Sequence, residues 1–294
     1  MSTHPDPNSH TEAAGRESLA DRKGYNDRFL GPAVPLPAPA DSGIKTVILP
    51  YTNFSVVFRP DRRLAAATAV TIDGANLVDV PRTDDWRFDP RLPEAQQTGD
   101  PVYQDNPLDK GHLVRRLDPV WGLQASTADQ DTFHYTNAAP QMNVFNQGKQ
   151  LWQGLENFLL EHAENFARKL TVFTGPVLED SDPPYRGIQV PLRFWKVAAF
   201  MQDGDLAASA YVLDQSPDLT KAAAAEAMAE AARVGDPPPL GAFRTFQVPV
   251  LDIARITGLN LGPLPAADRL PIGVRTARPW TLLESYDDIA MDES

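Results

Sequence analysis

The stretch Asp109-Lys110-Gly111-His112 is followed, after a longer interval, by Thr136-Asn137-Ala138-Ala139-Pro140-Gln141. Asn146-Gln147 and then Leu155-Glu156 follow within the next twenty or so positions. One short region of the chain thus contains a histidine, two asparagines and a glutamate. These groups offer a base, amide oxygens and a carboxylate, which together suit metal-assisted hydrolysis of a phosphodiester. We therefore expect residues 108–156 to form the centre around which the rest of the chain is organised.

Each of these residues has a candidate role in such a reaction. An imidazole near its ordinary pKa of about 6.5 can act as a base at neutral pH, which suits His112. Mg²⁺ prefers oxygen ligands and keeps most of its waters, so the amide of Asn146 could be its only protein ligand. Glu156, one or two helical turns later, could hold a metal-bound water. Lys110 and Arg82 are cations that could face the developing negative charge.

The same residues also have ordinary structural interpretations. His112 could be a turn histidine after a glycine, and Asn137 could stabilise a turn through its own backbone. Asn146 could be a helix N-cap. Glu156 could simply belong to a solvated helix face. Only the combination of motifs favours a functional site.

Together the motifs resemble the DNA/RNA non-specific endonucleases, the endonuclease G-like members of the ββα-metal, or His-Me finger, nucleases. The resemblance covers roughly residues 44–264. Beyond the motifs quoted above, it includes Asp131-Thr132-Phe133, Val172–Pro176, Val190–Val197 and Thr257–Leu259.

The resemblance implies a role for each motif residue. His112 falls on the family's general base, and Asn146 on the asparagine that holds Mg²⁺, for which Mn²⁺ could substitute. Asn137 would support the histidine or the scissile phosphate. Glu156 falls on the glutamate that holds a metal-bound water.

The resemblance also implies a transition-state arginine upstream of the histidine motif, which falls on Arg82, with Arg87 as the alternative. Lys110 replaces the family's arginine, so the charge is kept but a bidentate fork to phosphate is lost. The interval from Asn146 to Glu156 is roughly two positions longer than the family pattern, and two positions turn a helix by about 200°. Either the helix starts later, with Asn146 in a preceding loop, or Glu156 is not the water-holding acid.

The function implied by the resemblance is a metal-dependent, sugar-non-specific endonuclease that hydrolyses DNA and RNA and leaves 5′-phosphate ends. The alternative is a catalytically inactive module with the same finger fold that binds nucleic acid or protein. A toxin-like nuclease would share the chemistry and have a protein inhibitor as partner. Dimerisation is common in the family, so a homodimer is a further expectation. Walker A, GxSxG, HExxH and Rossmann motifs are absent from the sequence.

The charge balance bears on the expected substrate. The net charge is −12, from 27 basic and 39 acidic residues, which argues against a general nucleic-acid-binding surface. Lys110, Arg115 and Arg116 nevertheless cluster beside His112 and favour a local cationic cleft. Because the chain has no cysteine, neither a disulfide framework nor a thiolate metal site is expected.

The sequence also bears on location. The N-terminus begins Met1-Ser2-Thr3-His4-Pro5 and has neither a positive segment nor an apolar one, so no signal peptide is expected. Apolar runs are no longer than a strand, so no membrane span is expected. The expectation is a cytoplasmic protein by default, or one exported by a non-classical route, without a membrane partner.

The hydrophobic pattern predicts an α+β fold: a central, mostly antiparallel sheet flanked by helices, with an embedded ββα-metal finger. We expect residues 1–42 to form an extended Pro-rich arm and residues 43–294 a single nuclease domain with its motif core at 108–169. Strands are expected at Thr46–Leu49, Ser55–Phe58, Ala66–Ile72, Phe133–Thr136, Leu170–Thr174, Val190–Leu192, Phe194–Met201, Leu206–Leu213 and Phe246–Val248. Asp203-Gly204 is expected to form the hairpin turn between Phe194–Met201 and Leu206–Leu213. Helices are expected at Asn143–Lys169, Thr220–Arg233 and Val250–Thr257.

Overall fold

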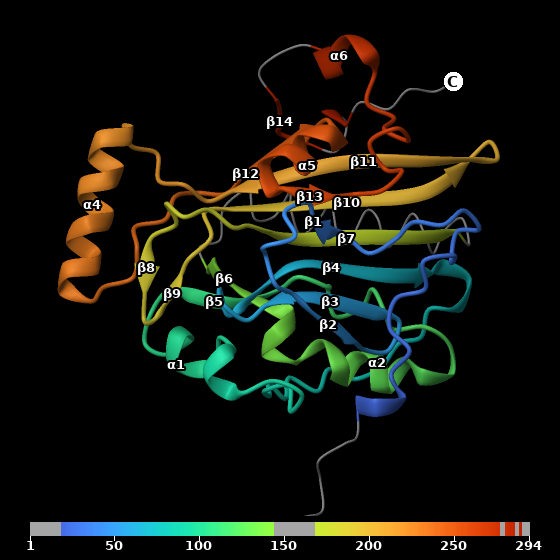
Figure 1. Ribbon diagram of the computed structural model, residues 1–294, viewed down its shortest axis with the longest axis horizontal. Coiled ribbons are helices and arrows are strands. Elements are labelled where there is room, and N and C mark those ends of the chain that lie inside the picture. Colours follow the sequence, from blue (N-terminus) through green and yellow to red (C-terminus); the bar gives the residue numbers. More distant parts are fainter. Residues whose placement is uncertain (1–18, 144–167, 277–279, 286–287, 290–294) are drawn as a thin grey trace, which may run out of the picture.

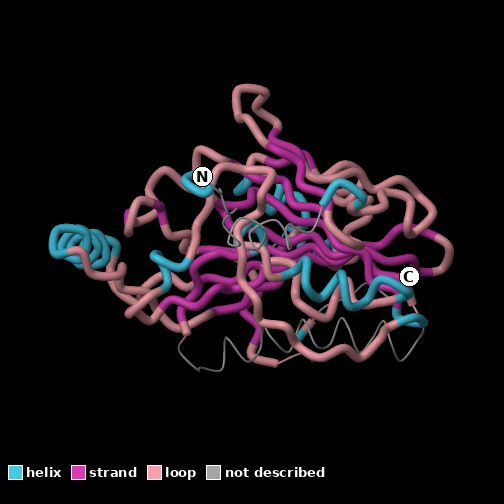
Figure 2. Tube along the Cα trace, turned by 90° about the horizontal axis from the view of Figure 1, so that it is seen from below, coloured by secondary structure: helices cyan, strands magenta, loops and turns pink. Residues whose placement is uncertain are grey.

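A twisted antiparallel sheet runs through the middle of the protein (Figures 1 and 2). The computed structural model describes residues 19–143, 168–276, 280–285 and 288–289. Within them the sheet has eight strands in the order β14-β12-β11-β10-β7-β4-β3-β2. Their bounds are β2 Val47–Pro50, β3 Phe54–Arg59, β4 Leu64–Asp73, β7 Lys169–Val177, β10 Arg193–Gln202, β11 Asp205–Asp214, β12 Arg244–Val248 and β14 Thr281–Leu283. The predicted α+β class with a mostly antiparallel sheet is confirmed.

Both faces of the sheet are buried, each against its own hydrophobic core. Successive side chains of a strand point to opposite faces, so neighbours on β10 separate: Phe194 packs in one core and Trp195 in the other. The first core also receives Leu113 and Val114, which directly follow His112. The sheet therefore provides a rigid floor for the motif region.

The motif region begins with a two-stranded sheet separate from the large one. β5 (Leu108–His112) pairs antiparallel with β6 (Ala138–Met142), with His112 opposite Ala138. These are the two strands of the expected finger. Its predicted helix, Asn143–Lys169, falls almost entirely on residues 144–167, outside the described residues. Its predicted end is wrong, because β7 already begins at Lys169.

Several helix and turn predictions are confirmed. The hairpin between β10 and β11 turns at Asp203-Gly204, where both residues have positive φ, as a two-residue hairpin loop requires. Helix α4 (Lys221–Val234) begins after Thr220, whose hydroxyl accepts the Ala223 N–H, and ends at Gly235. Figures 1 and 2 show α4 projecting from one end of the molecule.

The other α-helices within the described residues are short. They are α1 (Asp100–Tyr103), α2 (Ala125–Thr132), α5 (Val250–Thr257) and α6 (Ile272–Thr276). Helix α5 has its predicted bounds and ends at Gly258, whose φ is 65°. In the part of the chain that the structure describes, no helix combines the length and apolar character needed to cross a membrane.

Three strand predictions are corrected. Phe133–Thr136 is not a strand: α2 ends at Thr132, and Tyr135–Asn137 forms a single 3₁₀ turn. Val190–Leu192 is irregular and follows a small hairpin of β8 (Pro184–Tyr185) and β9 (Ile188–Gln189). Strand β7 continues through Gly175 to Val177 instead of ending there. Because glycine has no Cβ, Gly175 can lie close to the Ala66 carbonyl of β4, with which a Cβ would collide.

The described part of the N-terminal segment, residues 19–42, packs against both cores. Leu19 belongs to the core beneath the motif region, and Val34 to the core on the other face. Strand β1 (Ala38–Pro39) pairs with β13 (Leu259–Asn260). Arg22 Nε donates to the buried carboxylate of Asp131 at 2.8 Å, which ties this segment to α2.

We predict that Arg22→Met destabilises the protein by about 3 kcal/mol, because it leaves the fully buried charge of Asp131 without its cation. Urea unfolding followed by circular dichroism measures the change. Arg28→Met, at an exposed position of the same segment, is the control and should change the free energy of unfolding by less than about 0.5 kcal/mol. Equal effects of the two substitutions would contradict the prediction.

Candidate active site

His112 is the last residue of β5 and lies against β6. The glycine before it is required by packing, because a Cβ at Gly111 would collide with the side chain of Gln141 on β6. The motif glycine and the motif glutamine are thus coupled by close contact of the two strands. This contact keeps the backbone at His112 close to β6, where Ala138 lies opposite it.

Aromatic rings enclose the imidazole of His112. The Trp86 ring lies 4.7 Å from it and the Phe133 ring 5.1 Å, between centroids. The residue as a whole is half-buried, but Nε2 is covered and has no hydrogen-bond partner among the described residues. This ring nitrogen therefore has an unused hydrogen-bonding capacity within the described residues.

The pKa of His112 differs from the expectation. Burial, followed by the positive charge of Arg82, lowers it from 6.5 to about 3; Arg116 acts in the same direction, and Asp84 opposes them. The imidazole is therefore neutral at neutral pH. The sequence-based expectation of a nearly ordinary pKa is wrong because the rings exclude water from the charged form.

Asn137 holds the backbone that follows His112. Its side-chain Oδ1 accepts the Val114 N–H at 2.9 Å, while Nδ2 donates to the carbonyls of Val114 and Thr132 at 3.0 Å each. Its main-chain carbonyl accepts the Leu113 N–H at 2.9 Å. Both amide hydrogens are used and the residue is fully buried. Of the two roles that the resemblance implied, these contacts favour support of the histidine.

The two candidate arginines lie differently. The Arg82 guanidinium lies over the Phe133 ring, with its carbon 5.3 Å from the centroid, and its charge lowers the pKa of His112. It also pairs with Asp84 at 2.9 Å, which lowers the pKa of that carboxyl. Arg87 instead lowers the pKa of His134. Of the two, Arg82 is thus the arginine whose charge acts on His112.

Lys110 reaches the same aromatic surface as His112, two positions before it on β5. Its Nζ lies 5.5 Å from the centroid of Trp86 and 5.8 Å from that of Tyr135. It donates to Asp100 at 2.8 Å, and this hydrogen bond is the main reason that the pKa of Asp100 is lowered. Trp86 is therefore in contact with both the imidazole and this ammonium group.

Trp86 was not predicted to be a site residue, although the structure places it against both His112 and Lys110. Its signal was weak: a tryptophan in a long irregular segment, where functional side chains are often found. Asp129 was also missed. Its buried carboxylate accepts Arg116 at 2.7 Å and the hydroxyl of Thr83 at 3.0 Å.

Two predicted site residues, Asn146 and Glu156, lie outside the described residues. Among the residues that the structure does describe, no group of three or more His, Cys, Asp or Glu side chains is arranged to hold a metal ion. The donor expected for Mg²⁺ is the amide oxygen of Asn146, the donor type that this ion prefers, whereas Glu156 is expected to hold a metal-bound water.

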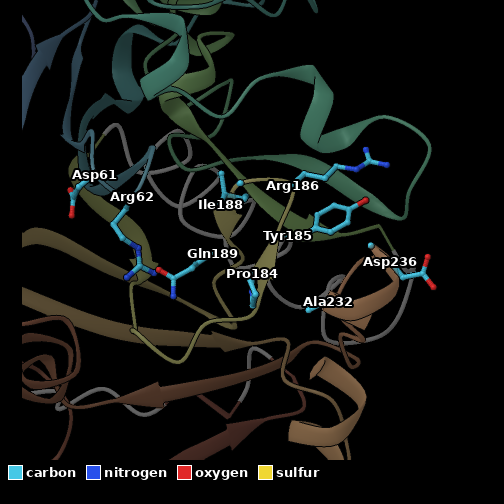
Figure 3. Close-up of a pocket in the computed structure, with 11 residues that line it drawn as sticks. Asp61, Arg62, Pro184, Tyr185, Arg186, Ile188, Gln189, Ala232 and Asp236 are labelled. Carbon is cyan, nitrogen blue, oxygen red and sulfur yellow. The ribbon is translucent and has the colours of Figure 1, made fainter. Parts of the chain in front are cut away.

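One cleft lies beside the described site residues, and a second hollow lies away from them. A cleft of about 910 Å³ lies beside Trp86, and Arg87, His134, Tyr135 and Asp100 are also in its wall. A second hollow of about 510 Å³ lies between the β8–β9 hairpin and the end of α4 (Figure 3). Of the predicted site residues that the structure describes, none lines this second hollow.

The lowered pKa of His112 predicts a pH-dependent stability. Above pH 6.5 the folded and unfolded states both carry a neutral imidazole, so His112 adds no pH dependence. Between pH 6.5 and about 3 only the unfolded chain takes up the proton, so the free energy of unfolding falls as the pH falls. His112→Gln removes this contribution.

Between pH 7 and pH 5 the unmodified protein should lose up to about 2 kcal/mol more stability than His112→Gln. Urea unfolding at the two pH values measures the difference. The buried His134 shifts in the same direction in both proteins and so cancels. Identical losses in the two proteins would show that His112 titrates normally in the folded state.

The chain is similar to known proteins in sequence and in fold. The family model for the DNA/RNA non-specific endonucleases matches residues 38–268. The uncharacterized protein y4fB of Sinorhizobium fredii is 41% identical over 276 residues, which cover 86% of this chain and 40% of that protein. The chain thus spans about two-fifths of that relative's length. A crystal structure of the EndoG/EndoGI complex is similar in fold, with a TM-score of 0.52 and 18% identity over 72% of this chain and 84% of that one.

Proposed function

The chain belongs to the DNA/RNA non-specific endonuclease family, and we propose that it is a metal-dependent endonuclease in which His112 is the general base. One observation carries the proposal: a neutral imidazole whose Nε2 is covered and has no partner among the described residues, beside an arginine. The proposed nuclease domain comprises residues 43–294, with residues 1–42 as an arm.

In the proposed reaction, Nε2 of His112 takes a proton from a water as that water attacks the phosphorus. The bond from phosphorus to the 3′ oxygen breaks and that oxygen takes up a proton from solvent water, so the products carry a 5′-phosphate and a 3′-hydroxyl. The nucleophile is water and not the sugar's 2′-hydroxyl, so DNA and RNA are both substrates. Enclosure by Trp86 and Phe133 keeps the imidazole neutral, which is the form that can take up a proton, although it also makes the group a weaker base.

Charge stabilisation in the proposed reaction comes from the side chains around the base. Arg82 faces the phosphoryl oxygens as their negative charge grows, and Lys110 adds a second positive charge from β5. A Mg²⁺ ion held by Asn146, with Mn²⁺ as a substitute and Glu156 holding one of its waters, would stabilise the leaving oxygen. Asn137 acts only on the backbone, where it fixes the position of the base.

Carboxylates neutralise these cations in the free protein. Arg82 pairs with Asp84, and Lys110 with Asp100, in ion pairs with largely exposed carboxylates. Exposed pairs contribute at most about 1 kcal/mol, so a phosphate can displace the carboxylate at low cost. The proposed substrate affinity is therefore modest and falls as salt is added, in keeping with a net charge of −12.

The proposed partners are DNA and RNA as substrates, together with a second copy of the chain. A protein inhibitor is a further proposed partner. The structure of similar fold concerns inhibition of EndoG in its complex with EndoGI. An inhibitor of this chain would act most directly by covering His112 and Arg82.

We predict that the protein nicks supercoiled plasmid and degrades RNA in the presence of Mg²⁺, and that a chelator stops both reactions. His112→Ala should lower kcat by about 10³-fold, because it removes the base. Asn146→Ala should raise the Mg²⁺ concentration needed for half-maximal activity, and Glu156→Ala should lower kcat. End-labelling of the products should find 5′-phosphates.

Two outcomes would contradict this proposal at different levels. If no divalent metal supports cleavage, the proposal that the protein is an enzyme is wrong. That result would favour a finger-fold module that only binds nucleic acid or protein. A fully active His112→Ala protein would show that His112 is not the base, while the proposal that the protein is an endonuclease would still hold.

The two arginines give a matched pair of variants. Arg82→Ala should lower kcat by about 10²-fold, because it removes one group that stabilises the transition state. Arg87→Ala, which removes the same side chain five residues away beside His134, should lower kcat by less than about threefold. Steady-state kinetics on a short duplex measures both. If Arg87→Ala lowers kcat more than Arg82→Ala does, Arg87 and not Arg82 is the transition-state arginine.

A further inference from the structure

Asp129 of α2 connects two separate segments of the site. Its side chain is 1% exposed. One carboxylate oxygen accepts the Thr83 hydroxyl at 3.0 Å, and the other accepts Arg116 Nη1 at 2.7 Å. Thr83 is the neighbour of Arg82, and Arg116 lies four positions after His112. A single buried carboxylate thus joins the loop of the arginine to the segment that follows the base.

A second contact strengthens the connection. Arg116 Nη1 also donates to the carbonyl of Val80 at 3.3 Å, two residues before Arg82. Val80 itself packs against Val120 and Ala125. The loop is therefore held on both sides of Arg82, by Val80 before it and by Thr83 after it.

The contacts of Arg82 itself are weaker. Its side chain is 53% exposed, and its ion-pair partner Asp84 is 60% exposed. Such a pair does not hold a long side chain in one geometry. The position of the guanidinium over Phe133 thus depends mainly on where the loop backbone is held.

The loop beyond this point has anchors of its own. The Arg87 N–H donates to the Phe133 carbonyl at 3.0 Å, and the Tyr135 N–H donates to the Arg87 carbonyl at 3.0 Å. Trp86 packs against His112. Loss of the Thr83–Asp129 hydrogen bond should therefore release only the turn that carries Arg82.

We propose that Asp129 is a positioning residue for catalysis: through Thr83 it holds Arg82 in register with His112. The inference rests on the proposed function, since it gives Arg82 its transition-state role. Asp129 touches neither substrate nor metal in this scheme. It acts through the loop, so its loss should lower kcat more than it changes KM.

Thr83→Val is the main test, because it removes the hydroxyl that donates to Asp129 and keeps the shape of the side chain. We expect kcat to fall about 10-fold and KM to change less than twofold, because a displaced charge stabilises the transition state less well. Thr98→Val is the control: it removes a buried hydroxyl that donates to the Arg63 carbonyl at 2.8 Å. It should leave kcat unchanged. Asp129→Asn, with its folding checked by circular dichroism, should reproduce the loss.

The decisive measurement is a double-mutant cycle with Arg82→Ala. If Asp129 acts through Arg82, Thr83→Val should have less than a twofold effect once Arg82 is absent. A full, independent loss of about 10-fold in that background would overturn the inference while leaving Arg82 as the transition-state arginine. If Arg82→Ala alone leaves kcat unchanged, it is instead the proposed role of Arg82 that fails.

Discussion

The hydrogen bonds of Asn137 are the constraint on which the rest of the site depends. A single side-chain amide binds the main chain of Val114 in both directions and also reaches the carbonyl of Thr132. These bonds join the end of the finger hairpin to the end of α2, and they fix the path of the chain as it leaves His112. The amide is buried, where a lost partner is costly, so the arrangement is both specific and rigid. The motif asparagine thus fixes the backbone next to His112, the proposed base, without touching its side chain.

The environment of the base follows from that rigidity. With the backbone fixed, the imidazole has only the space between Trp86 and Phe133, and there burial disfavours its charged form. The cations around it are each matched by a carboxylate nearby, as in the pairs of Arg82 with Asp84 and of Arg116 with Asp129. The result is a neutral acceptor in a region of balanced charge, in a protein that is acidic as a whole.

Local chemistry explains what could be predicted from the sequence. The Asp203-Gly204 hairpin and the ends of α4 and α5 depend on neighbouring residues, and they match the predictions closely. Phe133 was predicted to lie in a short strand, yet it follows α2 and packs against residues distant in the sequence. Strand β14 was missed because its three residues become a strand only by pairing with β12. Among the site residues, the spacing and family pattern indicated His112, whereas Asp129 acts on a loop 46 positions away.

The described N-terminal segment, residues 19–42, is also held by contacts with residues that are distant in the sequence. It meets the core beneath the motif region at Leu19 and the opposite core at Val34, and then pairs residues 38 and 39 with residues 260 and 259. Those pairs join points more than two hundred positions apart in the chain. Contacts of such long range are slow to form, because most of the chain must be ordered before they can close. This segment should therefore dock late in folding, and a chain still emerging from the ribosome cannot complete the strand pair until residue 260 has been synthesised.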